Sequence, residues 1–103
     1  MDQLAPFYDF SLEILDNHAL LIAYNSVWYQ DDICLMKEVI IKKLPAANTI
    51  ESLVGADRES LRFSWRSHAF MLHFEYYSQS CWIEAESEPS HFLINDLMAV
   101  LNH

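Results

Sequence analysis

Apolar and polar residues alternate along several short segments of the chain, and this period of two is the spacing of a β-strand with one buried face. The alternation and apolar content predict strands at 10–14, 19–24, 61–66, 70–76 and 81–86, with a weaker strand at 48–54. In the last three strong segments, aliphatic and aromatic side chains share one parity, while the other parity is mostly Ser, Arg, His and Glu. The pattern therefore predicts a sheet with one buried face.

The first two predicted strands form a hairpin whose register follows from apolar pairing. A three-residue turn at 16–18 places three apolar pairs opposite each other, namely Phe10 with Tyr24, Leu12 with Ile22, and Ile14 with Leu20. This register buries one face of the hairpin. Either Asn17 or His18 would supply the left-handed residue that the turn needs.

Two segments have helical spacing instead. The first runs from a cap at Asn25 or Ser26 to a stop at Pro45. Its predicted buried stripe is Tyr29, Ile33, Met36, Ile40 and Leu44. Further apolar residues widen this arc, so the helix is either deeply buried or partly available to a partner. The second helix follows Pro89, with a buried stripe of Ile94, Leu97, Met98 and Leu101.

The element order is β-β-α-β-β-β-β-α, and it predicts an α+β fold. An antiparallel sheet of about five or six strands, with both helices packed on one face, is the economical way to bury these stripes. The length of 103 residues suits a single domain spanning 1–103.

The last three strong strands are expected to pair as two hairpins. A turn about Ser67 and His68 would place Trp65 opposite Phe70, and a turn at 77–80 would place Tyr76 opposite Cys81. This register makes one face apolar. On the other face it predicts one row of Arg62, His73 and Glu84, with Met71, Trp82 and Glu86 in adjacent rows.

That outer face holds the candidate site residues. Arg62, His73 and Glu84 would orient an imidazole as a general base needs. We interpret them instead as an exposed cross-strand charge row, with His73 structurally minor, because an open sheet face offers no pocket. Met71 and Trp82, rimmed by Glu84 and Glu86, resemble a protein-binding anchor, or are covered by another segment.

Composition narrows the function further. The formal net charge is −9, and every Lys and Arg lies at or before Arg66, which disfavours nucleic acid as a partner. Cys34 and Cys81 lack the spacing of a metal site and have apolar neighbours, which predicts buried, reduced thiols and no metal or cofactor. The N-terminal residues do not resemble a signal peptide, and no apolar run is long enough to cross a membrane. We therefore expect a cytoplasmic protein.

Three functions remain open. We favour a non-enzymatic domain that acts through protein contact, either by self-association or by capturing a basic partner. The alternative is a small-ligand binder with a cavity between helices and sheet, lined by Trp28, Tyr29, Phe63 and Trp65. The third is an enzyme that uses His73 as acid or base.

Overall fold

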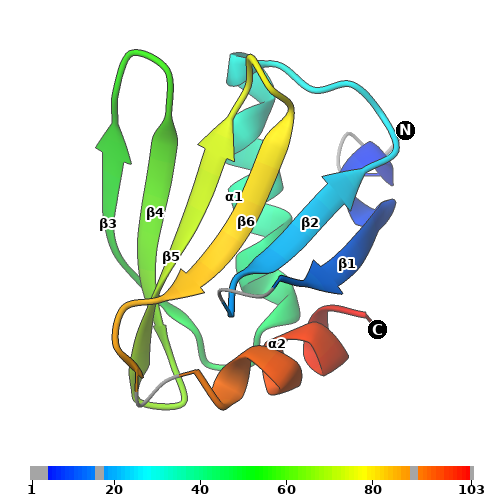
Figure 1. Ribbon diagram of the computed structural model, residues 1–103. Helices are drawn as coiled ribbons and strands as arrows, with labels where there is room; N and C mark the ends of the chain where they lie inside the picture. Colours follow the sequence, from blue (N-terminus) through cyan, green and yellow to red (C-terminus); the bar gives the residue numbers. More distant parts are fainter. Residues whose placement is uncertain (1–4, 16–17, 89–90, 103) are drawn as a thin grey trace.

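All six predicted strands pair into one antiparallel sheet in the computed structural model, which describes residues 5–15, 18–88 and 91–102. Figure 1 shows the strands in the spatial order β1-β2-β6-β5-β4-β3. Their bounds are β1 (Phe10–Ile14), β2 (Leu20–Tyr24), β3 (Asn48–Val54), β4 (Glu59–Trp65), β5 (His68–Glu75) and β6 (Ser80–Ala85). The predicted α+β fold and its element order are therefore confirmed.

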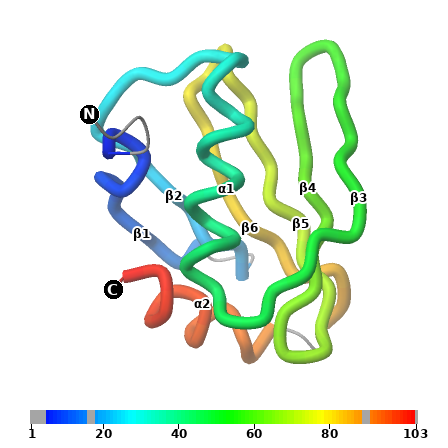
Figure 2. The backbone as a smooth tube through the Cα atoms, turned by 180° about the vertical axis from the view of Figure 1, so that it is seen from behind, coloured from blue at the N-terminus to red at the C-terminus, as the bar shows by residue number. Residues whose placement is uncertain are grey.

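Two α-helices pack on one face of this sheet. They are α1 (Ile33–Lys43) and α2 (Leu93–Leu101), and two short 3-10 helices, η1 (Ala5–Tyr8) and η2 (Gln30–Asp32), precede β1 and α1. Seen from behind, α1 runs across β2 and β6, while β3 and β4 extend beyond it (Figure 2). The helix layer thus covers the centre of the sheet and leaves one flank open. No helix among the described residues is long and apolar enough to cross a membrane.

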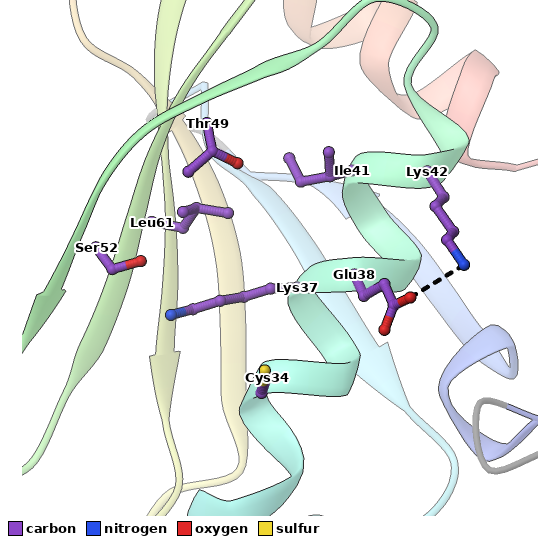
Figure 3. Close-up of a pocket in the computed structure, with 8 residues that line it drawn as sticks. All are labelled: Cys34, Lys37, Glu38, Ile41, Lys42, Thr49, Ser52 and Leu61. Carbon is purple, nitrogen blue, oxygen red and sulfur yellow. Dashed lines mark ion pairs between the residues drawn. The ribbon is translucent and has the colours of Figure 1, made fainter.

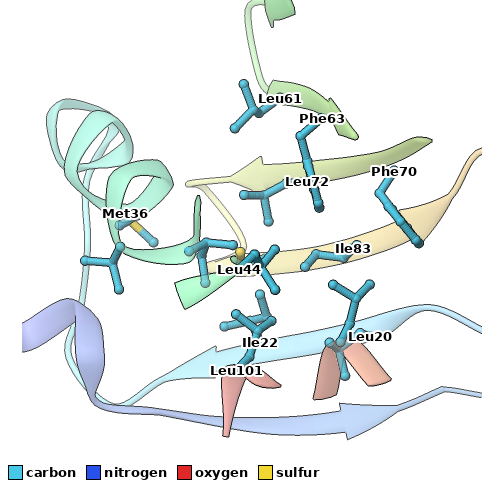
Figure 4. Close-up of a cluster of buried hydrophobic side chains, with 14 of the residues drawn as sticks. Leu20, Ile22, Met36, Leu44, Leu61, Phe63, Phe70, Leu72, Ile83 and Leu101 are labelled. Carbon is cyan, nitrogen blue, oxygen red and sulfur yellow. The ribbon is translucent and has the colours of Figure 1, made fainter. Parts of the chain in front are cut away.

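The core lies between α1, α2 and the inner face of the central strands (Figure 4). Side chains of alternating parity on β4, β5 and β6 meet the helices there, and burying each one fully stabilises the fold by roughly 1.5–3 kcal/mol. The side chains labelled in the figure are Leu20, Ile22, Met36, Leu44, Leu61, Phe63, Phe70, Leu72, Ile83 and Leu101.

The first hairpin has the predicted register. Phe10 pairs with Tyr24, Leu12 with Ile22, and Ile14 with Leu20. His18 has a φ of 62°, which confirms it as a left-handed turn residue. Asn17 lies outside the described residues. β2 then joins β6 through only two residue pairs, Leu20 with Ile83 and Leu21 with Trp82.

The registers predicted for the other two hairpins are wrong by two residues, although every side chain keeps its predicted face. Phe63, not Trp65, lies opposite Phe70, and Phe74, not Tyr76, lies opposite Cys81. Both turns lie one residue earlier than predicted: Arg66 and Ser67, with φ values of 52° and 66°, connect β4 to β5, and residues 76–79 connect β5 to β6. His68, expected in the turn, therefore begins β5 opposite Trp65.

The first helix is shorter than predicted. It begins at Ile33, after an irregular segment in which Trp28 is buried and Tyr29 is exposed. The side chain of Gln79 accepts a hydrogen bond from the Trp28 amide at 2.9 Å and donates one to its carbonyl at 2.6 Å. These bonds satisfy the Trp28 backbone outside a helix, which the local sequence does not reveal. Tyr29 was therefore wrongly placed in the buried stripe.

The second helix has the predicted stripe. Ile94, Leu97 and Leu101 are buried, and Met98 packs partly buried against the same core. Pro89, expected in the first turn, lies outside the described residues.

The hairpin turn yields a test of the register. Ser67 has a left-handed backbone, which costs a non-glycine residue about 1 kcal/mol. Ser67→Gly is therefore expected to raise the free energy of unfolding in urea by about 1 kcal/mol. Ser64→Gly, in the adjacent extended strand, is the matched control and should destabilise the protein. Equal effects of the two changes would contradict the turn assignment.

Candidate functional site

The outer face of the sheet, away from both helices, carries the residues that the sequence predicted as a site. Met71 lies between Arg62 and Glu84, so the predicted row of Arg62, His73 and Glu84 is wrong. The shift of two residues moves His73 into a different row that crosses five strands. That row is Leu53, Ser60, His73, Trp82 and Leu21.

His73 is buried, although it was expected to be exposed. Its side chain lies beside Trp82, with ring centroids 5.0 Å apart, and the residue is 9% exposed. Its Nδ1 is 2.7 Å from the hydroxyl oxygen of buried Ser60, and its Nε2 is 3.9 Å from a carboxylate oxygen of Glu84. Burial lowers the pKa of His73, and the charge of Glu84 opposes this shift only in part. His73 is therefore mainly neutral at pH 7.

The Ser60 hydroxyl, the His73 imidazole and the Glu84 carboxylate are the types of group found in a nucleophilic catalytic site. Whether they could act in this way depends on whether a substrate can reach Ser60. Ser60 is 5% exposed and lies in β4, between β3 and β5. A nucleophile needs access to substrate and nearby donors for the developing oxyanion, whereas amides of a central strand are used by the sheet. Ser60 and His73 are therefore a satisfied buried polar pair in this structure.

Trp82 is partly covered by polar side chains. Its Nε1 donates a hydrogen bond to Glu84 at 2.7 Å, and the guanidinium of Arg58 lies 5.2 Å from its ring centroid. Arg58 also bonds the carboxylate of Glu75 at 2.7 Å. These contacts explain why Trp82 is only partly exposed on a face that carries no helix.

Arg62 of β4 forms an ion pair with Glu86, which directly follows β6. Two guanidinium nitrogens of Arg62 contact the two carboxylate oxygens of Glu86, one of them at 2.8 Å. The Arg62 guanidinium lowers the pKa of the Glu86 carboxyl. Met71, Trp82, Glu84 and Glu86, the residues predicted to bind a partner, all lie on the outer face.

A groove that the sequence did not predict lies on the opposite, inner face (Figure 3). It has a volume of about 460 Å³ and separates α1 from β3 and β4. Lys37 and Ile41 project from the helix toward the strands. Lys37 forms an ion pair with Glu59, and Lys42 lies 3.0 Å from Glu38, so these charges are matched internally. The lining residues are Cys34, Lys37, Glu38, Ile41, Lys42, Thr49, Ser52 and Leu61.

The groove is bordered by β3, the edge strand of the sheet. All seven residues of β3 are exposed, whereas residues of β1, at the other edge, are alternately half-buried. Three of the β3 residues are large and apolar: Ile50 and Leu53 are each 47% exposed, and Val54 is 68% exposed. An edge strand also presents unpaired backbone N–H and C=O groups. β3 therefore combines apolar side chains with an open hydrogen-bonding edge.

The inner face of β3 explains why a groove forms there. Thr49 and Ser52 pair with the buried residues Phe63 and Leu61 of β4, and so face the helix side. They are too small and polar to fill the space beside α1. The weak alternation of apolar and polar residues at 48–54 was the sequence signal that could have indicated an exposed strand, because a strand without an apolar stripe has no face to bury.

The two cysteines have different environments. Cys81 is buried as predicted, and burial raises the pKa of its thiol. Cys34 is exposed in the groove, so its predicted burial is wrong. The residue lies on the flank of α1 that faces β3, where the sheet offers nothing to cover it.

The four aromatic residues that were expected to line a cavity between helices and sheet do not do so. Trp28, Phe63 and Trp65 belong to the packed core, while Tyr29 is 68% exposed. A second depression, of about 360 Å³, lies on the outer face where β2 separates from β6, and Leu21 and Trp82 are in its wall. Among the described residues, no group of three or more His, Cys, Asp and Glu side chains could hold a metal ion.

Comparison with known proteins identifies a family and no function. Residues 10–103 match the model of a family described as "Protein of unknown function (DUF3630)". No curated protein and no solved structure matches the chain.

The environment of His73 predicts a pH-dependent stability. Because its pKa is lowered in the folded state, the unfolded chain binds the proton more readily as the pH falls below about 6.5, and the free energy of unfolding should decrease. His73→Ala should remove this dependence between pH 7.5 and 5.5. At pH 7.5 it should cost about 1–3 kcal/mol, since the buried Ser60 hydroxyl loses its partner. Urea unfolding at several pH values measures both effects.

His18→Gln is the control, because His18 is exposed and His73 remains in place. This variant should keep the loss of stability at low pH. A His73→Ala protein that is as stable as wild type, with an unchanged pH profile, would contradict the buried pair.

The cysteines provide a second test. A thiol reagent should modify one thiol of the native protein quickly, and Cys34→Ser should abolish this reaction. Cys81 should react only after unfolding, because it is buried and its pKa is raised. Fast reaction of both thiols, or of neither, would contradict the accessibility of the groove.

Proposed function

Because the chain belongs to the DUF3630 family, for which no function is given, we propose a function from its geometry: it is a non-enzymatic protein-interaction domain. Its binding surface is β3 together with the groove beside α1. We refer to this region as the β3 surface, defined by the exposed edge of β3 and by Cys34, Ile41, Thr49, Ser52 and Leu61. The chemistry of an unpaired strand edge selects an extended polypeptide strand as the partner.

The observation that carries this proposal is the full exposure of β3. All seven residues are exposed, including three large apolar ones, in a strand that is hydrogen-bonded to β4 along its other side. Natural proteins protect their edge strands with charges, prolines, bulges or covering elements. β3 has one charged residue, Glu51, and one irregularity between Thr49 and Glu51, and no described helix covers it. An added strand would satisfy its backbone and cover Ile50 and Val54.

The outer face around Trp82 is the second candidate surface for the same function. It was expected from the sequence, and Met71, Trp82, Glu84 and Glu86 are grouped there. The indole nitrogen of Trp82 and the guanidinium of Arg58 already have partners within the chain. On the β3 surface, the backbone N–H and C=O groups on the open side of the strand have no neighbouring strand among the described residues. We therefore favour the β3 surface.

A site-specific photo-crosslinker distinguishes the two surfaces in the cell that makes the protein. An activatable residue at Ser52, on the β3 surface, is expected to give a covalent adduct with a polypeptide, because a bound strand would lie directly beside it. Ser11 is the matched control, since it is an exposed serine on the opposite edge strand. Mass spectrometry of the adducts measures the outcome.

Adducts at Ser52 but not at Ser11 support the proposal. In a third variant the activatable residue replaces Trp82, and adducts in that variant alone would move the binding surface to the outer face. Equal yields at Ser52 and Ser11, or no adduct at Ser52, would contradict a role for the β3 surface.

A further inference from the structure

We infer that the strand bound by the β3 surface is β3 of a second copy of this chain, so that two sheets join into one. This inference rests on the proposed function and names its partner. The two β3 strands would run antiparallel about a two-fold axis perpendicular to the sheet. The helix layers of both copies would then lie on the same face of a continuous sheet, and the two grooves would meet across the axis.

The distribution of charge favours a second copy at this edge. Residues 37–66, which form most of α1 and all of β3 and β4, hold all six Lys and Arg and only four of the fifteen acidic residues. That segment carries a formal charge of +2, and three of its arginines are paired with acidic residues from outside it: Arg58 with Glu75, Arg62 with Glu86 and Arg66 with Asp96. With these partners included the flank is close to neutral, at −1, while the other eight acidic residues lie elsewhere in the chain. Two copies with a net charge of −9 each repel least when these segments face each other. The β3 surface is thus the side on which self-association costs the least electrostatic energy.

The ion pairs of the flank strengthen this argument. Lys37 with Glu59, and Lys42 with Glu38, are each matched within one copy beside the groove. A second copy would therefore meet β3 without a buried unmatched charge, which is the main electrostatic cost of an interface. The single charged residue of β3, Glu51, lies on the outer face beside Arg62.

Glu51 also selects the register. In an antiparallel pair whose axis passes through Glu51, the two carboxylates would lie opposite each other, which is unfavourable. Side chains of the two strands share a face only if the axis passes through a residue, so the next register centres on Ser52. It places Glu51 opposite Leu53 of the second copy, which separates the carboxylates, and it brings Val54 beside the irregularity at Ile50. An axis at Leu53 would pair only residues 52–54, and an axis at Ile50 would fall on the irregularity between Thr49 and Glu51. We therefore favour the Ser52 register.

Symmetry explains why the contact would stop at two copies. Pairing β3 with β3 uses the same surface on both chains and closes after one contact. Pairing β3 with β1 of another copy would leave an open β3 edge and continue into a fibre. β1 is half-covered and carries Glu13, with Asp9 directly before it, so its edge is the more acidic one. The acidic edge thus protects the dimer against further growth.

Sedimentation of the purified full chain tests the inference over about 1 μM to about 1 mM. Wild type is expected to form a dimer that increases with concentration. Ser52→Lys should weaken dimerisation by about tenfold or more, because it places two ammonium groups opposite each other at the axis. Ser11→Lys, with the same change of charge on the other edge, should dimerise like wild type. Circular dichroism checks that both variants are folded.

A cross-link tests the register without introducing a charge. In a Cys34→Ser background, Ser52→Cys should give a disulfide-linked dimer under mild oxidation, since directly opposite Cβ atoms lie about 4.5–5.5 Å apart and a disulfide needs roughly 3.5–4.5 Å. Ser11→Cys is the control and should remain uncrosslinked. A Ser52→Cys protein that stays monomeric would overturn the register even if Ser52→Lys fails to fold.

The two levels of the proposal fail in different ways. A wild-type protein that is monomeric throughout the range, or a Ser52→Lys protein that dimerises like wild type, would overturn the second copy as partner. If residue 52 nevertheless gives adducts with a different protein in cells, the β3 surface keeps its proposed function. If neither a dimer nor an adduct at residue 52 is found, both proposals are wrong.

Discussion

The packing of α1 on the apolar face of β4, β5 and β6 is the contact on which the rest of the structure depends. It requires that every second residue of these strands be apolar, and it sets which face of the sheet is inside. Leu72, Phe74 and Ile83 on the strands and Met36 and Ile40 on the helix are fully buried by this contact. One helix is about 10–12 Å wide, whereas strands are spaced about 4.7–4.9 Å apart, so a single helix covers only part of a six-stranded sheet. Because α1 runs across β2 and β6, β3 is the strand left uncovered (Figure 2).

This geometry gives the two faces of the sheet different roles. On the outer face, polar and aromatic side chains form a closed set of internal contacts, in which Ser60 bonds His73, Glu84 bonds Trp82, and Arg62 pairs with Glu86. On the inner face, the space beside α1 is bordered by small residues of β3 and remains a groove. A binding surface is expected where side chains and backbone lack internal partners, which favours the β3 surface over the residues around Trp82.

The sequence predicted those features that depend on alternation between near neighbours. The faces of the first hairpin and of β4 to β6 were correct because one parity of each strand is apolar. The register of the first hairpin was also correct, because its turn was placed at the right residues. The two-residue shift at Arg66 and Ser67 could not be predicted, since shifting a hairpin by two residues preserves both faces and leaves the pattern unchanged. Together with the equal shift of the second hairpin, it placed Met71 instead of His73 between Arg62 and Glu84 and removed the predicted acid–base row. The late start of α1 at Ile33 follows an irregular segment in which Gln79, a residue distant in the chain, bonds the backbone of Trp28. The exposure of Cys34 depends on where α1 lies across the sheet.

Amide hydrogen exchange along β3, measured as a function of protein concentration, tests the central claim most directly. The account predicts that the amides of β3 that point away from β4 become more protected as concentration rises, while those of β1 do not change. Exchange of these β3 amides that is fast and equal at all concentrations, with every other strand protected, would show that the edge remains unpaired and would contradict self-association through β3.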